Sequence, residues 1–122
     1  MLQKMLRLTA LLDRYGALLT SRQREMCENY YLDDYSLGEI AEIYGVSRQA
    51  VHDTLMRAER AMEEYETVLA LIRKSEQLSG DLGDIISQLA SATSALRSGD
   101  AEKAVQELDH ARNKLEQLKA DL

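Results

Sequence analysis

The sequence predicts an all-α protein, and three observations support this fold class. The 122 residues include no proline, phenylalanine or tryptophan, and the strong helix formers Leu, Ala, Glu, Arg and Met dominate. Apolar residues recur at alternating spacings of three and four, the period of an amphipathic helix. Capping residues and glycines stand where these stripes begin and end. We expect a helix-turn-helix, winged-helix-like domain over residues 1–66, then a helical extension over 67–122 that holds the end of a long helix and a C-terminal antiparallel hairpin.

The first elements are predicted from one stripe and one cap. The stripe runs at spacings of four and three through Met1, Met5, Leu8, Leu12 and Tyr15. Gly16 is expected to end this helix. Thr20 and Gln23 have the spacing of a capping box, which predicts a second helix over residues 21–31. The pair Tyr30 and Tyr31 on that helix is more typical of core packing than of a base-stacking platform.

Residues 36–60 have the pattern of a helix-turn-helix. Ser36 and Glu39 form a capping box for a first short helix, and Gly45 ends it because glycine adopts left-handed backbone angles without a Cβ clash. Ser47 then caps a second helix. In a DNA-binding helix-turn-helix, the N-terminal residues of this second helix contact base edges in the major groove. A helical hairpin used only for packing remains the alternative.

Polar residues at the start of the second helix are the candidate DNA-binding residues. They are Ser47, Arg48, Gln49, His52 and Arg57. Arginine can pair bidentately with guanine and glutamine with adenine, each contributing ~1–3 kcal/mol of discrimination. The alternative for Arg48 is an ion pair with Glu42 or Asp53. The local basic patch would consist of Arg22, Arg24, Arg48, Arg57 and Arg60.

The net charge of −6 argues against strong nonspecific DNA binding, which depends on Lys and Arg contacts to phosphate. Residues 1–66 hold 8 Lys and Arg against 12 Asp and Glu, and residues 67–122 hold 7 against 9. Any DNA binding should therefore use the local patch, weakly or as a dimer. The acidic series Glu59, Glu63, Glu64 and Glu66 is expected to form a solvated helix face.

The second helix of the motif is expected to be long. Its apolar stripe continues through Val51, Leu55, Ala58, Met62, Tyr65, Leu69 and Ile72, and no glycine or proline interrupts it before Gly80. A helix over residues 47–78 would extend about 48 Å. Such a rod should not bury its stripe against the small N-terminal unit alone, so we expect the tail or a second copy to cover it, and a homodimer. Residues 79–83, with two glycines, are a hinge candidate.

The tail carries two heptad-like stripes joined by a turn at residues 98–100, with Asp100 as a helix cap. The first contains Leu78, Leu82, Ile85, Leu89, Ala92 and Leu96; the second contains Ala101, Ala104, Leu108, Ala111, Leu115, Leu118 and Leu122. They predict an antiparallel hairpin, whose stripes serve core packing, a partner interface, or both. The candidate dimer or partner interface is Leu55, Met62, Tyr65, Leu69, Ile72, Leu89, Leu108 and Leu115.

Other function classes find little support in the sequence. Phosphate-binding loops, HExxH and CxxC motifs are absent, and Cys27 has no motif linking it to His52 or His110. We expect no catalysis, no cofactor and no metal site. One cysteine, no apolar run of about 18 residues and a poor signal-peptide pattern lead us to expect a cytoplasmic protein without membrane insertion.

The N-terminal half resembles a known family. Residues 15–20, Gln23, 30–42, 45–51, Asp53 and Arg57 resemble the YlxM-like family of small bacterial helix-turn-helix proteins, and the motif is similar to region 4 of sigma factors. The resemblance spans roughly residues 11–71. It implies a cytoplasmic, DNA-binding-like regulatory protein, linked through gene neighbourhood to the signal recognition particle pathway. His52 stands where the family usually has Tyr, and the tail beyond about Ser79 matches the family pattern poorly.

Two functions follow as hypotheses. The first is a dimeric DNA-binding regulator that uses residues 47–57. The second is a module that does not bind DNA, in which the long helix and hairpin bind a protein or a ribonucleoprotein such as the signal recognition particle.

Overall fold

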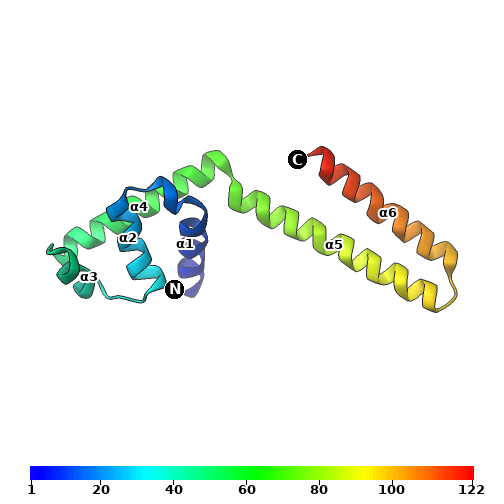
Figure 1. Cartoon of the computed structure of the whole chain (residues 1–122), viewed down its shortest axis with the longest axis horizontal. Coiled ribbons are helices and arrows are strands. Elements are labelled where there is room, and N and C mark those ends of the chain that lie inside the picture. Colours follow the sequence, from blue (N-terminus) through cyan, green and yellow to red (C-terminus); the bar gives the residue numbers. More distant parts are fainter. The chain divides into compact units, whose positions relative to one another are not determined.

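The computed structural model describes all 122 residues, and every regular element is helical, which confirms the all-α fold (Figure 1). The helices are α1 Leu2–Tyr15, η1 Gly16–Leu18, α2 Ser21–Cys27, η2 Glu28–Leu32, α3 Leu37–Tyr44, α4 Arg48–Leu69, α5 Leu71–Arg97 and α6 Ala101–Ala120. No strand forms, so the helix-turn-helix has no β-hairpin wing beside it. None of the helices combines the length and the apolar character needed to cross a bilayer.

The chain divides into two compact units, Met1–Lys74 and Ser75–Leu122. We call them the N-terminal unit and the hairpin unit. The boundary expected after residue 66 falls inside α4, whose residues up to Leu69 pack with the N-terminal unit. Most of α5 belongs to the hairpin unit, and its first turn belongs to the N-terminal unit.

The N-terminal unit encloses a core of large side chains from α1, α2, α3 and α4. Its fully buried members include Leu11, Tyr15, Met26, Cys27, Ile40, Val51 and Met62. The stripe of α4 therefore packs within its own unit, and Leu55, Ala58 and Ile72 join the same core. The expectation that this unit could not bury the stripe alone is wrong, because the stripe is shorter than predicted and three other helices surround it.

Local capping signals formed as the sequence predicts. The Thr20 hydroxyl accepts a hydrogen bond from the backbone N–H of Gln23, whose side chain accepts in return from the N–H of Thr20, both at 3.2 Å. Helix α1 ends at Tyr15, immediately before Gly16. The helix expected over residues 21–31 is α-helical only to Cys27 and continues as a π-helical turn, η2.

The predicted helix over residues 47–78 is broken at Ala70, which has left-handed angles of φ 53° and ψ 33° and is buried. The Tyr15 hydroxyl donates to Glu66 Oε1 at 2.6 Å and accepts from the backbone N–H of Leu71 at 3.0 Å. The Glu66 carboxylate also accepts hydrogen bonds from the backbone N–H groups of Ile72 and Arg73, at 3.0 and 3.3 Å. These bonds satisfy the first N–H groups of α5, which offsets the strain of a non-glycine residue in this conformation.

Glu66 is buried, so its expected place on a solvated face is wrong. The Tyr15 hydroxyl, followed by the two backbone N–H groups, lowers the pKa of Glu66, and burial acts in the opposite direction. Burial raises the pKa of Tyr15, as does its bond to Glu66. Because the folded-state pKa of Glu66 lies below its ordinary value of 4.5, its contribution to stability is present above that pH and is lost as the pH falls through the lower value.

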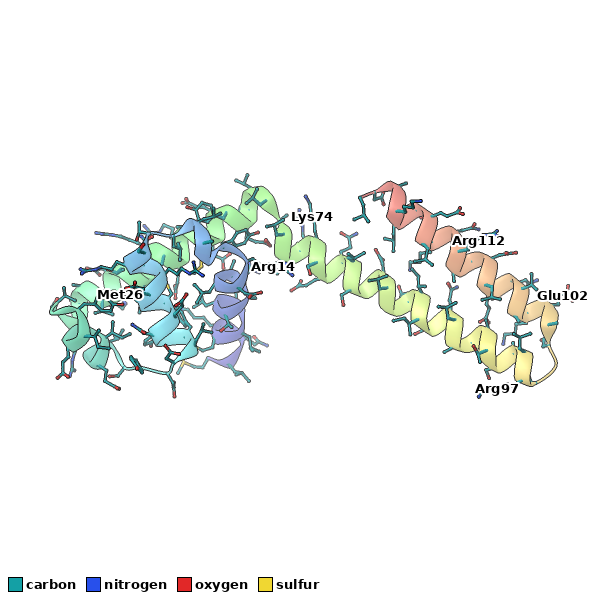
Figure 2. All side chains as sticks on the ribbon, viewed as in Figure 1. Arg14, Met26, Lys74, Arg97, Glu102 and Arg112 are labelled. Carbon is teal, nitrogen blue, oxygen red and sulfur yellow. The ribbon has the colours of Figure 1, made fainter.

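The hairpin unit consists of α5 and α6 in antiparallel order, as predicted. Arg97 and Glu102 flank the turn, where Gly99 has a φ of 85° (Figure 2). Asp100 caps α6 by accepting from the backbone N–H of Lys103 at 3.1 Å. The hinge expected at residues 79–83 is wrong, since α5 runs through both glycines without a break. A glycine costs about 1 kcal/mol in a helix, too little to interrupt 27 residues held by a partner helix.

Candidate nucleic-acid interface

The helix-turn-helix is formed by α3, Gly45 and α4. The Ser36 hydroxyl accepts from the backbone N–H of Glu39 at 3.1 Å, and Glu39 accepts from the N–H of Ser36 at 3.2 Å. Gly45 has left-handed angles of φ 65° and ψ 37° and ends α3. The Ser47 hydroxyl then accepts from the backbone N–H of Ala50 at 3.0 Å and caps α4. All these predicted devices are present, so the first turn of α4 is held firmly at the surface.

Arg48 lies back over α3. A Cβ placed on Gly38 would stand 3.1 Å from both Nε and Nη2 of Arg48, so the missing side chain of Gly38 makes room for the guanidinium. No ion pair joins Arg48 to Glu42 or Asp53, the partners considered from sequence. Arg48 remains exposed, and it can reach a base edge by changing rotamer without breaking a charge pair.

Asp53 links the two other candidates in the same part of α4. Gln49 Nε2 donates to Asp53 Oδ1 at 2.9 Å, and His52 Nδ1 lies 3.5 Å from the same oxygen. Both contacts are exposed, since the His52 and Asp53 side chains are each 53% accessible. The carboxylate orients the Gln49 amide, and it also adds a negative charge to this surface, which is unfavourable for an approaching anion.

The five arginines of the expected patch differ in how free their charges are. Arg24 pairs with Glu28 at 3.0 Å, and Arg22 lies over the ring of Tyr44 with 5.3 Å between its Cζ and the ring centroid. Arg57 and Arg60 are exposed on α4 and make no hydrogen bond or ion pair. The free positive charge near the motif is therefore carried by α4 itself.

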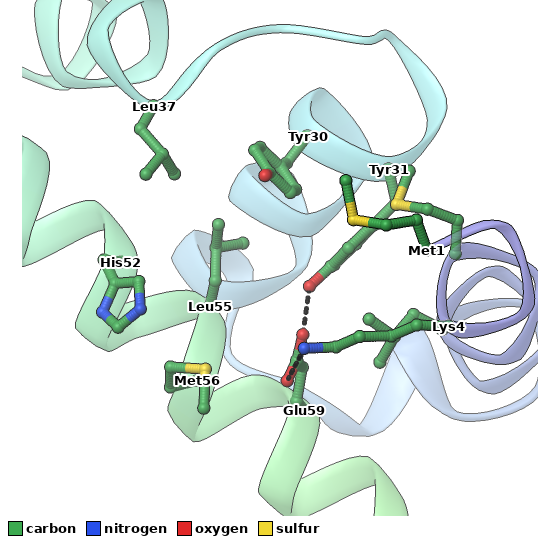
Figure 3. A pocket seen from close by; sticks show the side chains of 11 residues that line it. Met1, Lys4, Tyr30, Tyr31, Leu37, His52, Leu55, Met56 and Glu59 are labelled. Atoms are coloured by element: carbon green, nitrogen blue, oxygen red, sulfur yellow. Dashed lines mark hydrogen bonds and ion pairs between the residues drawn. The ribbon is translucent and has the colours of Figure 1, made fainter.

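A pocket of about 250 Å³ lies beside the same helix (Figure 3). Leu8 and Met5 of α1, Tyr30, Tyr31 and Leu37 form its apolar part, and α4 contributes His52, Leu55, Met56 and Glu59. His52 thus belongs both to the candidate reading surface and to the pocket wall. The volume is below the ~300–1,000 Å³ typical of small-molecule sites.

Glu59 is a second glutamate whose expected place on a solvated face is wrong. Its side chain is only 15% accessible, accepts a hydrogen bond from the Tyr31 hydroxyl and lies 4.0 Å from Lys4 Nζ (Figure 3). Tyr31 and Tyr30 stack edge to face with ring centroids 5.1 Å apart and pack against the core, as expected from sequence. Burial and the bond to Glu59 raise the pKa of Tyr31.

The remaining candidates are the side chains that could ligate a metal and the thiol of Cys27. The side chains that ligate metals form no group of three or more. Cys27 is fully buried, and burial together with Glu59 and Glu28 raises the pKa of its thiol to about 12. A thiol in that setting stays protonated and unreactive.

The candidate partner residues fall into two groups. Leu55, Met62 and Ile72 are at most 6% exposed and belong to the core of the N-terminal unit, where Tyr65 packs against them. Leu69, Leu89, Leu108 and Leu115 are 41–44% exposed. The first group serves intramolecular packing, and only the second is accessible to a partner.

Sequence reasoning missed the roles of Gly38, Tyr15 and Glu66. Gly38 is a helical glycine, and nothing in its neighbourhood of the sequence indicates that Arg48 packs over it. Tyr15 and Glu66 are 51 residues apart, so no local pattern joins them. The only signal in the sequence was Glu66, four residues before the break at Ala70, and a glutamate there is equally typical of a solvated helix face.

The helix-turn-helix formed by α3, Gly45 and α4 has a counterpart in the description of the family that the sequence matches. Residues 2–108 match the model of a family described as "Putative helix-turn-helix protein, YlxM / p13 like". The chain belongs to this family, UPF0122. The match covers α1 to α5 and the first part of α6, which corrects the expectation that the tail beyond about Ser79 departs from the family pattern.

Individual relatives support the same conclusion. UPF0122 protein GK1195 of Geobacillus kaustophilus is 50% identical over 111 residues, which span 89% of this chain and 97% of that protein. A UPF0122 protein of Desulforamulus reducens is 44% identical over 110 residues, 90% of this chain and 91% of its own. UPF0122 protein BH2485 of Halalkalibacterium halodurans is 51% identical over 92 residues, 75% of this chain and 81% of its own.

Proposed function

We propose that this protein is a non-enzymatic, cytoplasmic regulator that binds double-stranded DNA through the start of α4. The supporting observation is the exposed first turn of α4, which both helix caps and the left-handed Gly45 hold in place. Ser47 is positioned to contact a phosphate through the helix N-terminus, and Arg48 and Gln49 to contact bases. Arg57 lies nine residues after Arg48 on α4, and its unpaired positive charge is available to the phosphate backbone.

The binding surface predicts moderate affinity that weakens as the salt concentration rises. Asp53 opposes phosphate approach, and the net charge of −6 opposes long-range attraction. Sequence preference should therefore depend on contacts of Arg48 and Gln49, each contributing ~1–3 kcal/mol, more than on bulk charge. The family resemblance also implies a regulatory role linked to the signal recognition particle pathway, which we include in the proposal.

The test is selection of binding sites from a pool of random DNA duplexes, followed by anisotropy titrations of the selected duplex between 50 and 200 mM salt. Arg48→Ala with Gln49→Ala should weaken binding at least about tenfold and leave helicity unchanged. Arg112→Ala with Asn113→Ala is the matched control, because it removes the same charge and one amide from an exposed stretch of α6. Equal affinity of the two double variants would rule out the proposed reading surface.

A second candidate is favoured by a specific observation, the half-exposed leucines of the hairpin unit. In this alternative the helix-turn-helix is a scaffold, and the long helices bind a protein or a ribonucleoprotein such as a signal recognition particle component. This candidate gains support if no duplex is selected at 50 mM salt. Binding of a protein partner that survives 200 mM salt would also favour it, since contacts to DNA phosphates weaken steeply between 50 and 200 mM salt.

A further inference from the structure

The seam between α5 and α6 is built from small and polar residues. Its buried apolar members are Ile85, Ala92, Ala95, Ala104 and Ala111. Gln88 and Glu107 also lie in it, each with one buried oxygen, and Lys114 pairs across it with Asp84 at 3.0 Å. Alanines permit a close approach of the two helices, and they bury little apolar area.

The leucines of the hairpin stand beside this seam. On α5, Leu82, Leu89 and Leu96 recur every seven residues, and on α6 Leu108 and Leu115 do the same. They are 40–56% exposed. A seven-residue step is close to two helical turns, so each set forms a row along its helix. We call these two sets the leucine rows.

Both leucine rows face the same side of the hairpin. Leu89 directly follows Gln88 of the seam, and Leu108 directly follows Glu107, so each leucine is rotated by about 100° from a seam residue. In an antiparallel pair, residues rotated by the same angle about each helix axis from the contact lie on the same side of the pair. The other side carries polar residues such as Asp84, Ser91, His110 and Gln117. The hairpin therefore has one apolar and one polar face.

The apolar face is large enough for a stable interface. Helix α6 has 20 residues and is about 30 Å long, and two packed helices are about 20 Å wide, which gives a face of roughly 600 Å². Stable interfaces bury ~600–1,000 Å² on each partner. Covering this face with a second hairpin produces a four-helix bundle, in which leucines from all four helices fill a common core.

Charge disfavours occupants other than protein. The hairpin unit contains 5 Lys and Arg against 9 Asp and Glu, so DNA and anionic membrane surfaces are repelled. The leucine rows are self-complementary, because the Leu89 and Leu108 layer lies near the middle of the hairpin with further leucines on either side. A two-fold axis through this layer brings the same patch of two copies together, as an isologous interface requires.

We propose that two copies of this chain associate through the leucine rows of α5 and α6 to form a four-helix bundle. Of the interface residues expected from sequence, this interface keeps Leu89, Leu108 and Leu115 and leaves out Leu55, Met62 and Ile72, which are buried inside each N-terminal unit. The leucine rows include no residue of the helix-turn-helix. The inference is independent of DNA binding, since the leucine rows and the start of α4 share no residue.

The test is sedimentation equilibrium of the full chain across a concentration series. The wild-type protein should have twice the 13.8 kDa chain mass in the micromolar range. Leu89→Ala with Leu108→Ala preserves helix propensity and removes four leucine side chains from each dimer, so the dissociation constant should rise at least about a hundredfold. Leu89→Glu with Leu108→Glu should give a monomer.

The matched control is Ser87→Glu with Gln117→Glu, which adds the same two charges on exposed positions away from the leucine rows and should remain dimeric. Circular dichroism of the leucine→alanine variant confirms that both helices persist. A wild-type chain that is monomeric up to about 100 μM would overturn the proposal, as would an unchanged dissociation constant in that variant. The Arg48→Ala, Gln49→Ala protein should still be a dimer. Its dimerisation can therefore be judged whatever the DNA experiment shows.

Discussion

The two units bury different kinds of side chain. The N-terminal unit closes over Tyr15, Leu11, Met26, Ile40 and Met62, all with at most 1% exposure. The hairpin unit buries one isoleucine and four alanines, and leaves its leucines about half exposed. A core of large side chains can stabilise a small unit by itself, whereas a seam of alanines cannot. The N-terminal unit is therefore self-sufficient, and the hairpin unit depends on a partner to cover its leucine rows.

The largest effect should come from opening the closed core. Met62→Ala removes a fully buried side chain from α4 and should destabilise the N-terminal unit by ~2–5 kcal/mol. All six tyrosines lie in residues 15–65, so tyrosine fluorescence during urea unfolding reports this unit alone. Met56→Ala makes the same change on the same helix at a side chain that is 39% exposed, and should cost much less. Similar losses in both variants would contradict the assignment of Met62 to the closed core.

An intermediate effect of opposite sign is expected in the seam. Glu107 has a carboxylate oxygen that is buried without a hydrogen-bond partner, a penalty of about 1–3 kcal/mol. Glu107→Leu should stabilise the hairpin unit by a similar amount, seen by far-UV circular dichroism at fixed protein concentration with no change in tyrosine fluorescence. Glu116→Leu, at an exposed position on the same helix, should stay within about 0.5 kcal/mol of wild type. If Glu116→Leu were equally stabilising, general hydrophobicity and not the buried oxygen would be responsible.

The smallest effects should distinguish the glycines of the two units. Gly83 lies inside α5 with no atom near an added Cβ, so Gly83→Ala should stabilise the hairpin unit by ~0.5–1 kcal/mol. Gly45 has a φ of 65° in the turn, and Gly45→Ala should destabilise the N-terminal unit by ~1–2 kcal/mol. Thermal melts of the two variants should move in opposite directions. A shift of the same sign in both would mean that backbone angle does not control either position.

Features fixed by neighbouring residues were predictable from the sequence. The capping boxes at Thr20 and Ser36, the turn at Gly45 and the caps at Ser47 and Asp100 each involve residues three positions apart or a single glycine. These local rules also located the candidate DNA-binding residues on the first turns of α4. The DNA-binding role itself stays a prediction, because side-chain geometry alone does not measure affinity.

Features fixed by distant residues were not predictable. The break at Ala70 depends on Tyr15, which reaches Glu66 and Leu71 from the end of α1. The seam of the hairpin is rotated from the predicted stripe toward Gln88 and Glu107, which leaves the leucines of the stripe about half exposed. Periodicity finds an apolar stripe, and it does not reveal which edge of the stripe meets the partner helix.

The burial of Cys27 has a consequence for measuring motion. It is the only cysteine of the chain, it is fully buried, and its thiol has a pKa raised to about 12. A disulfide reagent can therefore react with it only while the N-terminal unit is transiently open. At reagent concentrations so high that the labelling rate no longer depends on the reagent, that rate equals the opening rate of the unit that carries the helix-turn-helix. At lower concentrations it reports the equilibrium population of the open state.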